Sequence, residues 1–165
     1  MVRWGAMSFY IAGLAPPINN AALPYTLATM PQLFESIFLS ELSSDVPPAD
    51  IGKIVRAARV NHASESLSGL MLFDGERFCH YLEGAEPAVR HRVTRITEDS
   101  RFVGLRQLHE GFAEECRRFD VWQVGMLAPD GPSPLLALST LQGVAAVDAL
   151  LQLFRDRKTH DIHVL

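Results

Sequence analysis

Apolar residues follow a regular pattern only after Met30. The run Phe34-Glu35-Ser36-Ile37-Phe38-Leu39 is short, apolar and rich in aromatic residues, which predicts a first strand. A loop with Pro47 and Pro48 follows, and Asp50 is a candidate N-cap. A helix over about 50–62 is predicted because four apolar side chains and one histidine recur at the spacing of one helical face: Ile51, Ile54, Val55, Ala58 and His62.

The next segment has the pattern of a hairpin. Residues 67–73 form an apolar run, Asp74-Gly75 is a turn signal that tolerates positive φ, and residues 77–83 form the return strand. Gly84 ends that strand, and a second amphipathic helix is predicted over about 86–98 from Val89, Val93 and Ile96. A fourth strand is expected within 104–113 and a fifth over 121–126.

The predicted order β-α-β-β-α-β-β is typical of a ferredoxin-like α+β fold, with both helices on one face of the sheet. After a linker with Pro129 and Pro134, residues 135–154 predict one or two further helices, and residues 155–165 a polar tail. Three parts are therefore expected: a disordered leader or misassigned start over 1–30, a core domain over 31–128 and a C-terminal helical extension over 129–165.

The composition favours an ordinary globular domain. Of the 165 residues, 48% are hydrophobic and 21% charged, and the net charge of -4 argues against a nucleic-acid binder. No apolar run approaches the ~18–20 residues that span a bilayer. Arg3 and the apolar patch after it resemble a signal peptide only weakly, since Pro16 and Pro17 interrupt the patch. With two scattered cysteines, Cys79 and Cys116, the protein is expected in the cytoplasm, and translation can begin at Met1, Met7 or Met30.

Catalytic and metal-binding motifs are not found in the sequence. It contains no GxGxxG, phosphate loop, HExxH or Gly-x-Ser-x-Gly element. His160 and His163 are three residues apart but lack further ligands. Cys79 and His80 are adjacent on a strand and therefore point to opposite faces, so they cannot form one nucleophilic site. We expect no enzyme activity and no metal.

Polar residues interrupt the apolar faces where the helices should meet the sheet. His80 shares a strand face with Phe78 and Leu82, so it is either a hydrogen-bonded core histidine or a group that contacts a ligand. Asn61 and His62 either stop the first helix or point hydrogen-bonding groups at a ring edge. Arg95 and Asp99 flank the second helix, where a solvated face explains them equally well.

Four segments together resemble the BLUF family, the sensors of blue light using FAD. They are LFESIFLSEL, RVNHASESLSGLMLFDGERFCHYLEG, RITEDSRF and RRFDVWQVGM, and the resemblance extends over about residues 34–126. It implies a ferredoxin-like fold that holds the isoalloxazine ring of FAD between its two helices.

The resemblance assigns residues to that site. Asn61 and His62 fall where two residues hydrogen-bond the carbonyl and N–H edge of the ring, although the second is usually Asn. Arg95 matches the arginine near the flavin C2 carbonyl, and Asp99 the acid near the ribityl chain. Ile54 matches an apolar residue that packs on the ring, and Trp122 the tryptophan of the last strand.

The departures from the family fall on its photochemistry. The electron- and proton-donating Tyr of the family corresponds to Phe38, and the switching Gln to His80. The methionine expected two residues after Trp122 is Val124. The resemblance thus implies an FAD-binding sensory protein with an impaired or absent blue-light photocycle.

Two alternatives remain open. The first is a flavin-free module that acts through contacts with a protein partner or as a homo-oligomer, for which the Leu-rich stretch 135–154 offers an apolar surface. The second is a small enzyme such as an acylphosphatase, but residues 40–43 offer no arginine-bearing anion loop. A redox or haem role for His62 and His80 has no supporting motif.

Overall fold

A five-stranded sheet forms the centre of the computed structural model, which describes residues 32–113, 116–127 and 131–158. The strands lie in the order β4-β1-β3-β2-β5, and only β2 and β5 pair in parallel. The expected leader over 1–30 and the histidines at 160 and 163 lie outside the described residues. The strand bounds are β1 (Phe34–Leu42), β2 (Ser68–Phe73), β3 (Arg77–Gly84), β4 (Phe102–Phe112) and β5 (Trp122–Met126).

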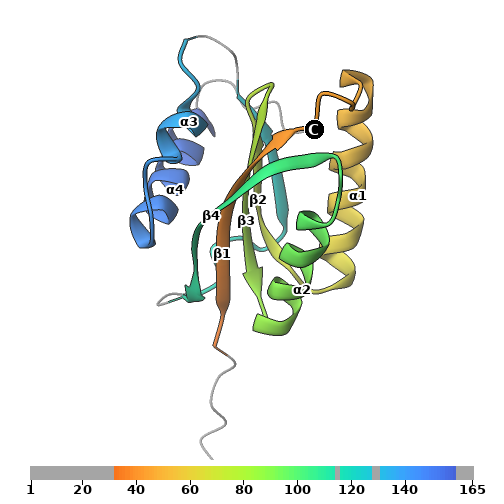
Figure 1. Cartoon of the computed structure of the whole chain (residues 1–165). Coiled ribbons are helices and arrows are strands. Elements are labelled where there is room, and N and C mark those ends of the chain that lie inside the picture. The colour runs from red at the N-terminus through yellow and green to blue at the C-terminus, as the bar shows by residue number, and fades with distance from the viewer. Residues whose placement is uncertain (1–31, 114–115, 128–130, 159–165) are drawn as a thin grey trace, which may run out of the picture.

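Helices cover both faces of this sheet. In Figure 1, α1 (Ile51–Ser64) and α2 (Glu86–Thr97) lie on one face, while α3 (Pro134–Leu138) and α4 (Val144–Lys158) lie on the other. A single 3-10 turn, η1 (Pro48–Asp50), leads into α1. The predicted ferredoxin-like α+β fold with additional C-terminal helices is confirmed.

Two local predictions hold only in part. Asp50 is the N-cap residue of α1, as predicted, but its side chain makes no capping hydrogen bond, because η1 already holds its backbone near helical angles (φ -90°, ψ -8°). Its carboxylate instead lies 2.6 Å from Lys53 Nζ. The helix expected to end at residue 154 continues to Lys158, and a hydrogen bond of 2.7 Å from Gln152 to Asp156 spans that extra turn.

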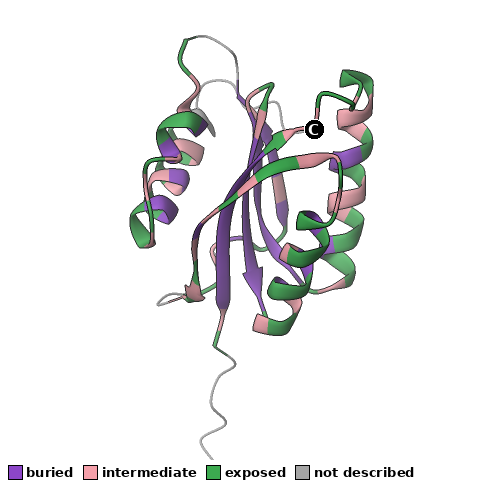
Figure 2. Cartoon of the chain, viewed as in Figure 1, coloured by how far each residue is buried: buried purple, intermediate pink, exposed green. Residues whose placement is uncertain are grey.

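The alternation of side chains along the strands divides the hydrophobic core in two. Ile37, Leu39, Cys79 and Tyr81 pack beneath α3 and α4, whereas Phe38, Phe78 and Leu82 pack beneath α1 and α2. Because both faces are covered, the central strands are buried without interruption, as Figure 2 shows. Cys79 and His80 lie on opposite faces, as predicted.

The strand register brings three segments of the chain together beneath α1 and α2. His80 on β3 is paired with Phe38 on β1 and with Met71 on β2. The parallel pairing of β2 with β5 places Trp122 opposite Gly69. Gly69 has a φ of +146°, and a Cβ there would lie 2.0 Å from the Tyr81 carbonyl oxygen and 3.0 Å from the Trp122 ring, so only glycine fits.

Candidate functional site

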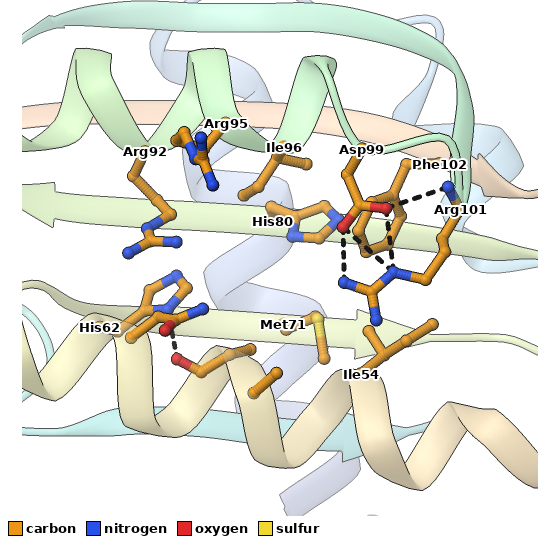
Figure 3. A pocket seen from close by; sticks show the side chains of 13 residues that line it. Ile54, His62, Met71, His80, Arg92, Arg95, Ile96, Asp99, Arg101 and Phe102 are labelled. Atoms are coloured by element: carbon orange, nitrogen blue, oxygen red, sulfur yellow. Dashed lines mark hydrogen bonds and ion pairs between the residues drawn. The ribbon is translucent and has the colours of Figure 1, made fainter.

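A cavity of about 160 Å³ lies between α1, α2 and the sheet, and Figure 3 shows its side chains. It brings together most of the residues that the sequence singled out: Ile54, Asn61, His62, His80, Arg95 and Asp99. Phe38 and Trp122 do not line the cavity but pack directly against two residues that do. The remaining lining residues are Ala57, Ala58, Met71, Arg92, Ile96, Arg101 and Phe102.

The imidazole of His62 presents one hydrogen-bond acceptor to its surroundings. Its Nδ1 lies 2.5 Å from the Ala58 carbonyl oxygen, which can only accept, so Nδ1 carries the proton. Burial lowers the pKa of His62 to about 4, so the ring is neutral at pH 7. Its buried Nε2 is therefore an unprotonated acceptor, and it has no partner among the described residues.

His80 is part of an aromatic stack in the floor of the site. Its ring lies parallel to Phe38 with centroids 4.7 Å apart, because the two residues are direct cross-strand neighbours. His80 Nε2 lies 3.2 Å from Ser40 Oγ. Burial, with a smaller contribution from His62, lowers the pKa of His80 to about 3, so this imidazole is also neutral.

Charged residues occupy both ends of the cavity. At one end Arg92 pairs with Glu65 through Nε at 3.0 Å and through a second, shorter contact. At the other end Arg101 Nε and Nη2 bind the Asp99 carboxylate at 2.9 and 2.5 Å (Figure 3). These hydrogen bonds lower the pKa of Asp99. Within the described residues Arg95 forms no ion pair, so its cation remains available at the rim.

Sequence reasoning missed Arg92 and Arg101. Arg92 is three residues from Val89 and four from Ile96, on the buried side of α2, so the helical periodicity contained a signal for it. Its burial depends on Glu65, which is 27 residues away in the sequence, and that partnership has no local signature. Arg101 follows α2 in a turn, and its position is set by Asp99 two residues earlier.

Trp122 forms a wall behind His62. The two rings have centroids 3.7 Å apart and are tilted by 36°. Trp122 is buried, and its Nε1–H has no acceptor within the described part of the chain. Trp122 does not line the cavity itself but packs on the imidazole of His62, which does.

Comparison with known proteins identifies the family. The family described as sensors of blue-light using FAD matches residues 33–125, which include both helices and all strands but the last residue of β5. The chain belongs to the BLUF family. The family binds flavin and senses blue light, in agreement with the resemblance read from the four motifs.

Individual BLUF proteins match only part of this chain. The chain is 29% identical over 99 residues to a photoactivated adenylate cyclase subunit beta of Euglena gracilis, covering 60% of this chain and 11% of the relative. It thus spans about a tenth of the length of the curated relatives that it matches.

Two solved structures show a similar fold. BlrP1 of Klebsiella pneumoniae, determined with FMN and cyclic diGMP, has a TM-score of 0.52 at 28% identity, covering 58% of this chain and 26% of that one. The dark-state structure of the BLUF protein BlrB has a TM-score of 0.53 at 26% identity, covering 60% and 74% of the two chains.

Within the described part of the chain, no group of three or more His, Cys, Asp or Glu side chains is arranged to hold a metal ion. No helix in that part of the chain combines the length and apolar character of a membrane span.

Proposed function

We propose that this protein binds flavin in the cavity between α1 and α2 and serves as a sensory or regulatory module whose blue-light photocycle is impaired or absent. Membership of the BLUF family supports the flavin. The similarity to a photoactivated cyclase subunit supports a regulatory role through a protein partner. When bound, FAD would supply the light absorption, and the residues of the chain determine how the excited ring reacts.

The hydrogen-bonding groups of the cavity fit one edge of a flavin. That edge contains an N–H between two carbonyl groups. His62 Nε2 is an acceptor without a partner among the described residues and is suited to the N–H. Asn61 has an amide that can donate to one carbonyl, and the Arg95 cation can donate to the other. An asparagine offers both a donor and an acceptor. His62 offers only the acceptor, because its one N–H donates to the Ala58 carbonyl oxygen.

The stack of Phe38 on His80 is the observation that carries the proposed loss of the photocycle. At these two positions the family resemblance implies a tyrosine that gives an electron and a proton, and a glutamine that rearranges its hydrogen bonds. Phe38 has no hydroxyl group, and His80 has no amide to rotate. The chain therefore lacks both the donor and the group that would change its hydrogen bonds.

Illumination of the flavin-loaded protein tests this proposal. We expect no dark-reversible red shift of the flavin absorption band in the wild-type protein. The double variant Phe38→Tyr with His80→Gln restores both missing groups and is expected to regain such a shift, while each single variant lacks one group. A clear reversible shift in the wild-type protein would overturn the proposal. Slow photoreduction through Trp122 would not, because it requires neither missing group.

The size of the cavity favours a second candidate, a BLUF-fold module that acts without flavin through protein contacts. The volume of about 160 Å³ is below the ~300–1,000 Å³ usual for ligand pockets. Leu136 and Val144 on the C-terminal helices are exposed and offer apolar contacts to a partner or a second copy. Purification with added FAD followed by desalting separates the two candidates, because a colourless protein under several conditions favours the flavin-free module.

A further inference from the structure

A second and larger cavity lies behind the wall that His62 and Trp122 form. Its volume is about 550 Å³, within the ~300–1,000 Å³ range of small-molecule sites. It is built from the last turns of α1, the turn that leads into β2, and the segment that enters β5. Trp122 lines this cavity but not the one between α1 and α2, so the two are separate spaces.

The floor of this cavity is apolar and includes a flat ring. Leu67 and Trp122 are both more than nine-tenths buried, and Ala63 extends the apolar surface on the side of α1. Trp122 is 8% exposed, and the part of its indole that lines the cavity offers an aromatic contact to a bound ring. Gly69 keeps the indole in place, because any side chain there would collide with its ring and with the backbone of Tyr81.

The rim is cationic. Arg117 is held in position by Ser68 Oγ at 2.5 Å and by the carbonyl oxygens of Ser66 at 3.4 Å and Glu83 at 3.5 Å. All three are neutral groups, so the positive charge of this guanidinium is not neutralised by them. Arg59 on α1 forms no ion pair within the described residues. Asp120 also lines the rim, which leaves an excess of one positive charge there.

We propose that this cavity is a second binding site, for a small carboxylic acid with an aromatic body. A guanidinium fork matches a carboxylate geometrically, and the fixed hydrogen bonds of Arg117 mean that little ordering is needed on binding. The aromatic body of the acid contacts the exposed part of Trp122 and the side chain of Leu67, while its carboxylate lies between Arg59 and Arg117. This site does not depend on flavin binding.

The two tryptophans of the chain allow a direct test with the full-length protein. Trp4 lies outside the described residues, so the indole N–H signal of Trp122 in a ¹H–¹⁵N spectrum is assigned with a Trp4→Phe variant. Titration with 3-phenylpropanoate is expected to shift the Trp122 signal saturably at millimolar concentrations and to leave the Trp4 signal unchanged. The neutral analogue 3-phenylpropanamide is expected to bind at least tenfold more weakly, because it cannot form the charged pair.

Two arginines of α1 provide a matched pair of variants. Arg59→Gln is expected to weaken 3-phenylpropanoate binding about tenfold, whereas Arg56→Gln, on the same helix but away from the cavity, leaves it unchanged. Equal shifts with the acid and the amide, a non-saturating response, or equal loss in the two variants would overturn the proposal. The titration is run without flavin, so a protein that fails to bind FAD can still support it.

Discussion

Buried polar side chains are treated differently on the two faces of the sheet. Beneath α3 and α4, Tyr81 donates to Glu35 at 2.6 Å, and Arg118 also binds Glu35. On the same side Glu83 accepts from Ser68 Oγ at 2.8 Å and from the backbone N–H of Phe119 at 2.7 Å. His109 Nε2, also on that side, has no hydrogen-bond partner within the described residues, but it lies 3.5 Å from the Glu35 carboxylate. Beneath α1 and α2 the buried Nε2 of His62 also lacks a partner there, and His62 lines the cavity.

This difference supports the proposal that the face beneath α1 and α2 binds a ligand, whereas the other face is structural. Polar groups that satisfy one another inside a continuous apolar core fix the fold, and Glu83 holds the segment that leads into β5. A buried acceptor beside a cavity costs about 1–3 kcal/mol unless something binds it. Under the proposed function, a ligand that donates a hydrogen bond to His62 Nε2 would recover that free energy.

The largest expected effect concerns the core between the sheet and the C-terminal helices. Leu150 on α4 is fully buried in the core between that helix and the sheet, so Leu150→Ala leaves a cavity and should lower the free energy of unfolding by about 2–5 kcal/mol. Leu136→Ala is the matched control, because Leu136 is exposed and should change it by less than about 0.5 kcal/mol. Urea unfolding measures both. Equal effects of the two variants would mean that the C-terminal helices do not form a core with the sheet.

The next effect concerns pH and the two neutral histidines of the cavity. Their pKa values are lowered to about 4 and about 3, against an ordinary value of about 6.5 in the unfolded chain. The unfolded chain therefore binds more protons below pH 6.5, so stability is fully present above that pH and declines as the pH falls. Between pH 7 and pH 5, each histidine should lower the free energy of unfolding by about 2 kcal/mol.

His80→Gln tests this assignment. The variant removes one of the two titrating groups, so its free energy of unfolding should fall about half as steeply between pH 7 and pH 5 as that of the wild-type protein. His91→Gln replaces an exposed histidine on α2 and is the control for the loss of a histidine as such. If the His80→Gln and wild-type profiles ran parallel, the acid sensitivity would come from other groups.

Most of the fold could be predicted from the sequence because its helices and strands follow from local patterns of apolar and turn residues. The helical spacing of Val89, Val93 and Ile96 and the Asp74-Gly75 turn are local signals, and α2 and the hairpin are where they indicated. Asn61, His62 and His80 also line one cavity. The sequence could indicate this because the family motifs that contain them occur in the expected order.

Other features depend on partners that are distant in the chain. The proton of His62 is committed to a carbonyl one helical turn away, but the tautomer is apparent only from the side-chain geometry. The contact between His62 and Trp122 joins residues that are sixty positions apart. The cavity behind that contact required Arg117 to be fixed by the turn before β2, which no periodicity indicates.

The third prediction tests the acceptor on the functional face and depends on flavin binding. Lumiflavin has a ring N–H that can donate a hydrogen bond to His62 Nε2. In N3-methyl-lumiflavin a methyl group replaces that hydrogen. We expect the methylated ligand to bind at least tenfold more weakly, since the unpaired acceptor costs about 1–3 kcal/mol. Titration of the flavin fluorescence gives both affinities.

A His62→Ala variant provides the corresponding control. It removes the acceptor, so the preference for lumiflavin over N3-methyl-lumiflavin should shrink markedly, even if both bind more weakly. A preference that is unchanged in His62→Ala would assign the recognition of the N–H to another residue.

The smallest effect concerns how a ring enters so small a cavity. Because its volume is only about 160 Å³, some side chain at its edge must move before a flavin fits. Arg101 is one such side chain: it is 41% exposed, and moving it costs the part-buried ion pair with Asp99, about 1 kcal/mol. Arg101→Gln should therefore leave the free energy of unfolding nearly unchanged and raise the association rate of flavin a few-fold in stopped-flow measurements.

Arg90→Gln, on α2 but outside the cavity, is the control and should leave the association rate unchanged. Slower or weaker binding to Arg101→Gln would show that this arginine is a contact of the ligand and not a barrier to it.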